Sequence, residues 1–162
     1  WCTSHGVAVH TGTKVDAIET KGDALRVVLN NGSAVDADLV VSATGVRPNI
    51  ELLEGTGIAT RQGVLVDRHL RTSDPAVFAA GDVAEGIDFS TGEYSVQAIQ
   101  PTAAEHGQLA ARNMVGLRGA VHRGSVNMNV LDTLGLISSS FGLWMGKAGG
   151  DAAELLNRER YR

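Results

Sequence analysis

The residues best suited to chemistry are Gly81 and Asp82, which directly follow the apolar run Val77-Phe78-Ala79-Ala80. We expect Val77 to Ala80 to form a buried strand that ends at this Gly-Asp pair. Open α/β sheets bind ligands in the crevice outside the carboxyl ends of their strands. An ionised carboxylate only accepts hydrogen bonds, so Asp82 in such a crevice suits a ligand hydroxyl and not a phosphate. The alternative is that Asp82 is a simple helix N-cap or a loop carboxylate.

A second segment of interest is Ile99 to Gln108, which contains the start of the strongest predicted helix. Pro101 begins this helix, because the first helical turn has no use for the missing N–H of proline. The helix is predicted to continue to about Met114, and Gly116 ends it. His106 lies on this helix, and we expect it to be a surface residue or a packing contact.

A third segment runs from Asp36 to Asn49 and contains the apolar run Leu39-Val40-Val41. This run predicts a buried strand, followed by a turn at Gly45, where a residue with a Cβ would clash. A structural role is the favoured interpretation of Gly45. Contact between this turn and a cofactor is the alternative.

Two glycine-containing segments fail as phosphate-binding loops. Gly146-Lys147 resembles the end of such a loop, but Ala148 replaces the required Ser or Thr. Gly55-Thr56-Gly57 begins the dinucleotide-binding pattern, but position 60 is Thr60. The sequence therefore predicts that neither segment cradles a phosphate.

The remaining reactive residue types form no recognisable site. Cys2 is the only cysteine, so an internal disulfide is impossible, and a redox dithiol fails because position 5 is His5. The histidines show no zinc-binding spacing. We therefore predict no metal site and no catalytic proton donor or nucleophile in this chain.

The pattern of apolar residues and turn residues predicts an α/β fold. The expected strands cover residues 6–11, 14–19, 24–29, 64–67, 126–131 and 134–141, with a tight turn at 30–32 and a short helix at 48–53. Residues 82–95 are predicted to be a loop, and Asp151 is predicted to start a final helix through Arg160.

The composition is that of a globular domain and excludes several function classes. The 162 residues are 43% hydrophobic and 20% charged, with a net charge of −4. No basic patch suggests nucleic-acid binding, and no apolar run is long enough for a membrane helix. No signal peptide is recognisable, so a cytoplasmic location is expected.

The segments Asp36–Asn49, Thr72–Asp82 and Ile99–Gln108 together resemble the FAD-dependent pyridine nucleotide-disulfide oxidoreductases, of the NADH oxidase, rubredoxin reductase and nitrite reductase type. The resemblance implies the C-terminal half of such a protein, with a partial Rossmann-like FAD/NAD(P)-binding fold and the start of an α+β interface domain. It assigns residues 1–47 to the end of the NAD(P)H-binding domain, 48–117 to the FAD-binding domain and 118–162 to a truncated interface domain.

The resemblance also implies roles for particular residues. Asp82 would accept a hydrogen bond from the ribityl chain of FAD. Free N–H groups at Thr102 and Ala103 would face the flavin ring and, with the helix dipole, stabilise negative charge on the reduced ring. The implied cofactor-binding residues are Ala80, Gly81, Asp82, Val83, Pro101, Thr102, Ala103 and, as the lesser alternative, Gly45.

The implied function is the passage of electrons from NAD(P)H through FAD to an acceptor. The family needs two Gly-x-Gly-x-x-Gly loops for the pyrophosphates of FAD and NAD(P)H, and the chain contains neither. We therefore expect a missing N-terminal half or a second polypeptide, and self-association. The alternatives are a non-catalytic assembly module that keeps the fold without cofactor, and a generic α/β domain with a coincidental Gly-Asp pair.

Overall fold

The computed structural model describes residues 1–117, 119–143 and 145–155. The chain divides into two compact units, Trp1–Gly45 and residues 46–162, which we describe separately. The assignment of residues 1–47, 48–117 and 118–162 to functional domains stays a prediction.

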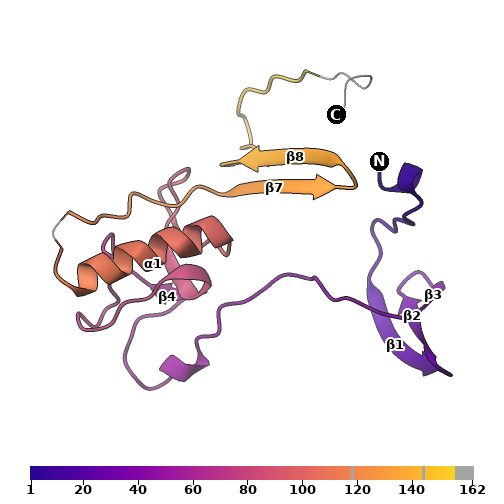
Figure 1. Ribbon diagram of the computed structural model, residues 1–162, viewed down its shortest axis with the longest axis horizontal. Coiled ribbons are helices and arrows are strands. Elements are labelled where there is room, and N and C mark those ends of the chain that lie inside the picture. Colours follow the sequence, from indigo (N-terminus) through magenta and orange to yellow (C-terminus); the bar gives the residue numbers. More distant parts are fainter. Residues whose placement is uncertain (118, 144, 156–162) are drawn as a thin grey trace. The chain divides into compact units, whose positions relative to one another are not determined.

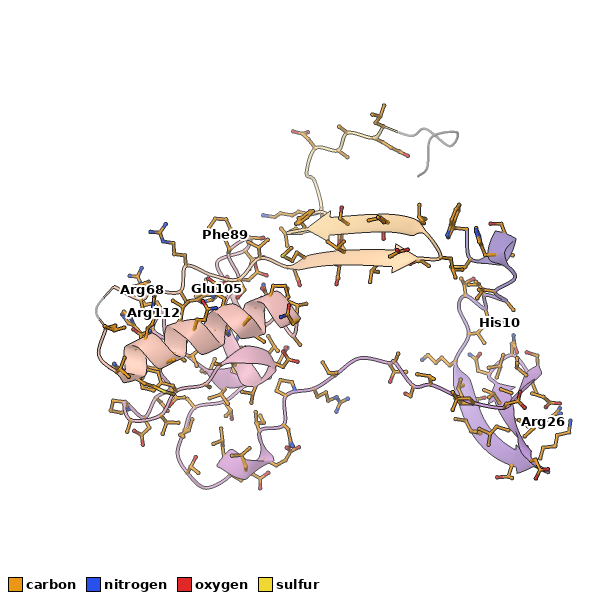
Figure 2. All side chains as sticks on the ribbon, viewed as in Figure 1. His10, Arg26, Arg68, Phe89, Glu105 and Arg112 are labelled. Carbon is orange, nitrogen blue, oxygen red and sulfur yellow. The ribbon has the colours of Figure 1, made fainter. Side chains whose placement is uncertain are left out.

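The first unit is a small antiparallel sheet with the strand order β1-β2-β3 (Figure 1). A short 3-10 helix η1 (Thr3–His5) precedes β1 (Val15–Lys21), β2 (Ala24–Leu29) and β3 (Ala34–Ala37). This confirms the two strands predicted at 14–19 and 24–29. Gly32 has φ +82° in the turn between β2 and β3, a conformation that glycine adopts without steric cost. Arg26 of β2, labelled in Figure 2, lies 3.6 Å from the carboxylate of Asp36 in β3.

Two predicted strands of this unit do not form. Residues 6–11 have no regular secondary structure. Residues 39–41 also form no strand, and Leu39 and Val41 are 76% and 77% exposed. An apolar run becomes a buried strand only where a neighbouring strand pairs with it, and no described residue pairs with 39–41. The prediction of a buried strand at Leu39–Val41 is therefore wrong for this chain.

The described residues of the second unit form a small mixed sheet, the α-helix α1 and a hairpin, and Figure 1 shows α1 and the hairpin. Its elements are η2 (Glu51–Leu53), β4 (Val64–Leu65), η3 (Gly81–Val83), β5 (Ala84–Ile87), β6 (Tyr94–Val96), α1 (Gln100–Met114), β7 (Met128–Thr133) and β8 (Leu136–Phe141). β5 is the central strand of the sheet and pairs parallel with β4 and antiparallel with β6. β7 and β8 form a separate two-stranded hairpin.

The core of the second unit lies between the sheet and α1. Four buried residues define it, Val66, Leu70, Ala84 and Ala110, and half-buried Phe78, Ala79, Ala80 and Leu109 pack against them. The prediction of the helix from Pro101 to Met114 is confirmed, and Gly116 follows it with φ +75°. The core thus joins the start of β5 to the helix that follows the sheet.

Several predictions for this unit are wrong. Val77 to Ala80 is half-buried extended chain held by a single bridge between Arg71 and Phe78, and not a strand. Residues 82–95 are not a loop, because they contain β5 and most of β6. Residues 151–155 are not helical, and the rest of the predicted final helix lies outside the described residues.

The structure as described contains no helix that is long and apolar enough to cross a membrane.

Candidate functional site

Gly81 and Asp82 form a sharp turn directly before β5. Ala80 is extended, with φ −147° and ψ 151°, and Gly81 then changes to φ +75° as η3 begins. Gly81 is buried, whereas Asp82 is exposed and Val83 is half-buried. No described residue forms a hydrogen bond or ion pair with the Asp82 carboxylate. The turn therefore presents an acceptor that is available to a ligand.

The start of α1 is the second predicted part of the site. Ile99 is the N-cap residue, and no side chain caps the helix. The Ala103 N–H donates to the Ile99 carbonyl at 3.0 Å, so the prediction that this N–H is free is wrong. It makes the first hydrogen bond within the helix, as expected three residues after the first helical position. The N–H of Thr102, in contrast, has no backbone acceptor among the described residues.

The structure brings these two predicted motifs into contact. A Cβ built on Gly81 would lie 3.3 Å from the Cβ and 3.7 Å from the Cα of Ala103. The Asp82 turn and the first turn of α1 are therefore neighbours, although 20 residues separate them in sequence. Gly45 belongs to the first unit and has φ +102°.

A buried histidine on α1 holds the same turn, and the sequence did not single it out for this role. His106 is 3% exposed, and its Nδ1 accepts a hydrogen bond from the Gly81 N–H at 3.3 Å. Burial, reinforced by the neighbouring His122, lowers the pKa of His106 to about 4. The spacing Thr102, His106 and Ala110 places all three on the buried face of the helix. Of the two expectations for His106, the packing contact is therefore confirmed and the surface residue is wrong.

A buried carboxylate, Glu85, follows Asp82 by three residues and lies on β5. Glu85 is 1% exposed and accepts hydrogen bonds from the Arg61 guanidinium and from the backbone N–H groups of Gln62 and Gly63, the last two at 2.9 and 3.0 Å. Burial raises the pKa of Glu85, but these donors outweigh it and leave the pKa below its ordinary value. Sequence reasoning missed this residue because β5 is only four residues long.

One buried amide near the helix start has no partner. Gln97 is 6% exposed, and neither its side-chain oxygen nor its nitrogen has a hydrogen-bond partner. Buried polar groups almost always form hydrogen bonds. The unpaired amide of Gln97 therefore suggests a hydrogen-bond partner outside this chain. No cluster of ligating side chains suited to a metal ion occurs among the described residues.

Comparison of the sequence with known proteins identifies relatives among NADH-dependent oxidoreductases. The sequence pattern of the family described as pyridine nucleotide-disulphide oxidoreductase matches residues 2–107. The chain is 33% identical to the NADH-dependent phenylglyoxylate dehydrogenase subunit epsilon of Aromatoleum evansii, over 90% of this chain and 35% of that protein. It is 34% identical to the NADH oxidase of Methanocaldococcus jannaschii, over 69% of this chain and 25% of that protein.

Solved structures agree in fold. A NAD-dependent persulfide reductase from A. fulgidus matches 80% of this chain with a TM-score of 0.74 and 34% identity. A FAD-dependent pyridine nucleotide-disulphide oxidoreductase from Desulfovibrio vulgaris matches 80% with a TM-score of 0.73 and 30% identity. The chain spans 24% and 33% of these two proteins. The α/β fold of the Rossmann-like FAD- and NAD(P)-binding proteins is thus confirmed, and the chain belongs to the pyridine nucleotide-disulphide oxidoreductase family.

Proposed function

We propose that this chain supplies part of the FAD site of an NAD(P)H-dependent oxidoreductase. The observation that carries the proposal is the close approach of Gly81 to Ala103, which puts the exposed carboxylate of Asp82 beside the start of α1. The two elements offer complementary chemistry, since Asp82 accepts hydrogen bonds and a helix start donates them.

The residues on these elements fit FAD. The ribityl hydroxyls are hydrogen-bond donors that suit the unpartnered carboxylate of Asp82, and the N–H of Thr102 suits an electron-rich ring atom. The unpartnered amide of Gln97, two residues before the N-cap, supports a polar ligand near this position. The residues proposed to hold FAD are Ala80, Gly81, Asp82, Val83, Pro101, Thr102 and Ala103.

When bound, FAD supplies the redox chemistry by taking electrons from NAD(P)H and passing them to an acceptor. The contribution of this chain is to hold the cofactor and to favour negative charge on its ring. We assign no catalytic proton donor or nucleophile to the described residues.

We further propose that other sequence completes the site. The pyrophosphate-binding glycine loops would come from the rest of a longer protein or from a second polypeptide, because this chain has neither loop. The strong exposure of Leu39, Val41 and Leu52 supports such a partner or self-association. In this proposal residues 1–47 close the NAD(P)H-binding domain, 48–117 belong to the FAD-binding domain and 118–162 begin an interface domain.

The test is the flavin content of the protein that carries this chain. We expect Asp82→Ala to weaken FAD binding about tenfold to a hundredfold, because a hydrogen bond to a charged group contributes about 1.5–3 kcal/mol. Flavin absorbance after gel filtration and the fluorescence of released FAD measure this loss. Glu51→Ala is the matched control, since Glu51 is also an exposed carboxylate in the first turn of a 3-10 helix.

Two results would refute the proposal. Flavin content that is unchanged by Asp82→Ala would remove Asp82 from the site. A protein that takes up no FAD with Asp82 intact would favour the alternative, a non-catalytic assembly module that keeps the family fold.

A further inference from the structure

A cluster of three buried polar side chains lies beneath the Gly81–Asp82 turn. His106, His122 and Ser125 are 3%, 5% and 5% exposed. The two imidazole rings meet edge to face, with centroids 4.6 Å apart and their Nε2 atoms 3.3 Å apart. The Ser125 hydroxyl lies 3.1 Å from the Nε2 of His122 and 3.3 Å from the Nε2 of His106. The cluster therefore joins α1 to the segment that follows it.

The contact with Gly81 fixes where the proton on His106 resides. The Gly81 N–H donates to Nδ1 of His106, so Nδ1 carries the lone pair and Nε2 carries the proton of a neutral ring. The Nε2–H group then donates to Ser125 Oγ or to His122 Nε2. A ring in this state cannot bind a metal through Nε2, and its Nδ1 is already used.

The environment of the cluster disfavours a charged ring. Burial is the main cause that lowers the pKa of His106 and of His122, and the carboxylate of Glu105 partly opposes the shift at His122. The side chain of Glu105 projects from α1 (Figure 2). His122 also lines an open pocket of about 510 Å³, through which a proton can reach the cluster. The other residues around the pocket are Asp67, Arg68, His69, Ile87, Tyr94 and Arg123.

We propose that His106 is a positioning residue for FAD: as a neutral ring it holds the Gly81 amide and thereby orients Asp82, and His122 with Ser125 keeps the ring in the required tautomer. This inference rests on the FAD site proposed above. Protonation of His106 at Nδ1 would place two N–H groups against each other and release the turn. FAD should therefore be released more readily in acid, because protonated His106 no longer holds the Gly81 amide.

The test compares His106→Asn with His106→Leu in the FAD-bound protein. The Oδ1 of asparagine replaces Nδ1 as acceptor for the Gly81 N–H and cannot be protonated, whereas leucine offers no acceptor. The two measurements are the rate of FAD release, from flavin fluorescence, and the protection factor of the Gly81 amide against hydrogen exchange. His10→Asn is the control for the loss of an exposed imidazole.

In the wild-type protein we expect faster FAD release and lower Gly81 protection as the pH falls from 6.5 towards 4. His106→Asn should remove most of this pH dependence. His106→Leu should release FAD about tenfold faster at neutral pH, as expected for one lost hydrogen bond at a buried amide. If His106→Leu does not fold, His106→Asn carries the test alone.

The inference is overturned if His106→Asn keeps the wild-type pH profile of FAD release while Asp82→Ala still weakens FAD binding. It is also overturned if Gly81 protection changes and FAD release does not, because the cluster then has only a structural role. Failure of the proposed function looks different, since the wild-type protein would then bind no FAD at all.

Discussion

Gly81 and Ala103 approach each other so closely that a Cβ on Gly81 would lie 3.3 Å from the Cβ of Ala103. This contact is tighter than ordinary packing between methyl groups. It requires glycine for two separate reasons, because Gly81 also has φ +75°. The contact fixes the Asp82 turn against the first turn of α1, and the proposed FAD site depends on it.

Gly81→Ala should destabilise the protein and impair flavin binding. A left-handed backbone costs a non-glycine residue about 1–2 kcal/mol, and the contact with Ala103 must relax in addition. We expect a total loss of about 2–3 kcal/mol in the free energy of unfolding. Urea denaturation gives the stability, and flavin absorbance gives the cofactor content.

Gly116→Ala is the matched control for this substitution. Gly116 also has φ +75°, but a Cβ built on it meets no atom within 4 Å. It therefore reports the backbone strain alone, and the difference between the two variants isolates the contact with Ala103. Equal losses of stability in both variants, with flavin content unchanged, would contradict the importance of this contact.

Glu85→Gln should also destabilise the protein, because it replaces one of the two acceptor oxygens of a buried carboxylate by an NH2 group, which donates. One N–H from Arg61, Gln62 or Gly63 would then meet another donor. We expect a loss of about 1–3 kcal/mol, as for one unsatisfied buried group. Asp36→Asn is the control, since Asp36 belongs to an exposed pair with Lys21 and should leave stability close to that of the wild type.

We also expect Glu85→Gln to change how the free energy of unfolding depends on pH. The pKa of Glu85 is lowered in the folded state, so its contribution to stability is complete above pH 4.5 and is lost as the pH falls through the folded pKa. Urea midpoints measured from pH 7 down to pH 3 should therefore converge for the wild type and Glu85→Gln at acid pH. A constant difference across this range would show that the Glu85 charge contributes nothing.

Local signals predicted some elements well. Pro101 and Gly116 marked the two ends of α1, and the Asn30–Gly32 turn marked the β2–β3 connection, because a helix start, a helix end and a tight turn depend on residues adjacent in sequence. The Gly81–Asp82 pair was also singled out from adjacent residues, but the strand predicted before it does not form and its role in holding FAD stays a prediction.

Elements that depend on distant partners were not predictable in this way. β5 pairs with residues about 20 positions earlier and 10 positions later, and its buried Glu85 reads as a loop residue in sequence. His106 and His122 meet only because the chain folds back after α1. Conversely, the apolar run Leu39–Val41 has the composition of a strand but lacks a neighbour to pair with among the described residues. Tertiary contact, and not local propensity, decided each of these cases.

Asn113→Ala should loosen the end of α1. Asn113 Nδ2 donates to the carbonyl groups of His69 and Ala120, at 2.9 and 3.0 Å, and so ties the helix to two loops. We expect a loss of about 1–2 kcal/mol in the free energy of unfolding, because the carbonyls of half-buried His69 and buried Ala120 each lose a donor. Gln108→Ala on the exposed face of the same helix should change stability by less than about 0.5 kcal/mol. Equal effects of the two substitutions would show that the hydrogen bonds from Asn113 to His69 and Ala120 do not stabilise the fold.

Leu134→Asn should stabilise the β7–β8 hairpin. Thr133 pairs with Leu136, so Leu134 and Gly135 form a two-residue loop, and both have positive φ, +54° and +82°. Such a turn favours the sequence Asn-Gly, and leucine is poorly suited to a left-handed conformation. Leu134 is 52% exposed, so little buried apolar surface is lost. We expect a gain of about 1 kcal/mol, measured as stronger protection of the hairpin amides against hydrogen exchange.

The control for this prediction is Leu136→Asn, which places asparagine at the first residue of β8. A strand position disfavours asparagine, so this variant should weaken the same amide protection. The two substitutions introduce the same side chain two residues apart and are expected to act in opposite directions. If both weaken protection, the loss of apolar contact at the hairpin outweighs the conformational strain at Leu134, and the turn is not the limiting feature of the hairpin.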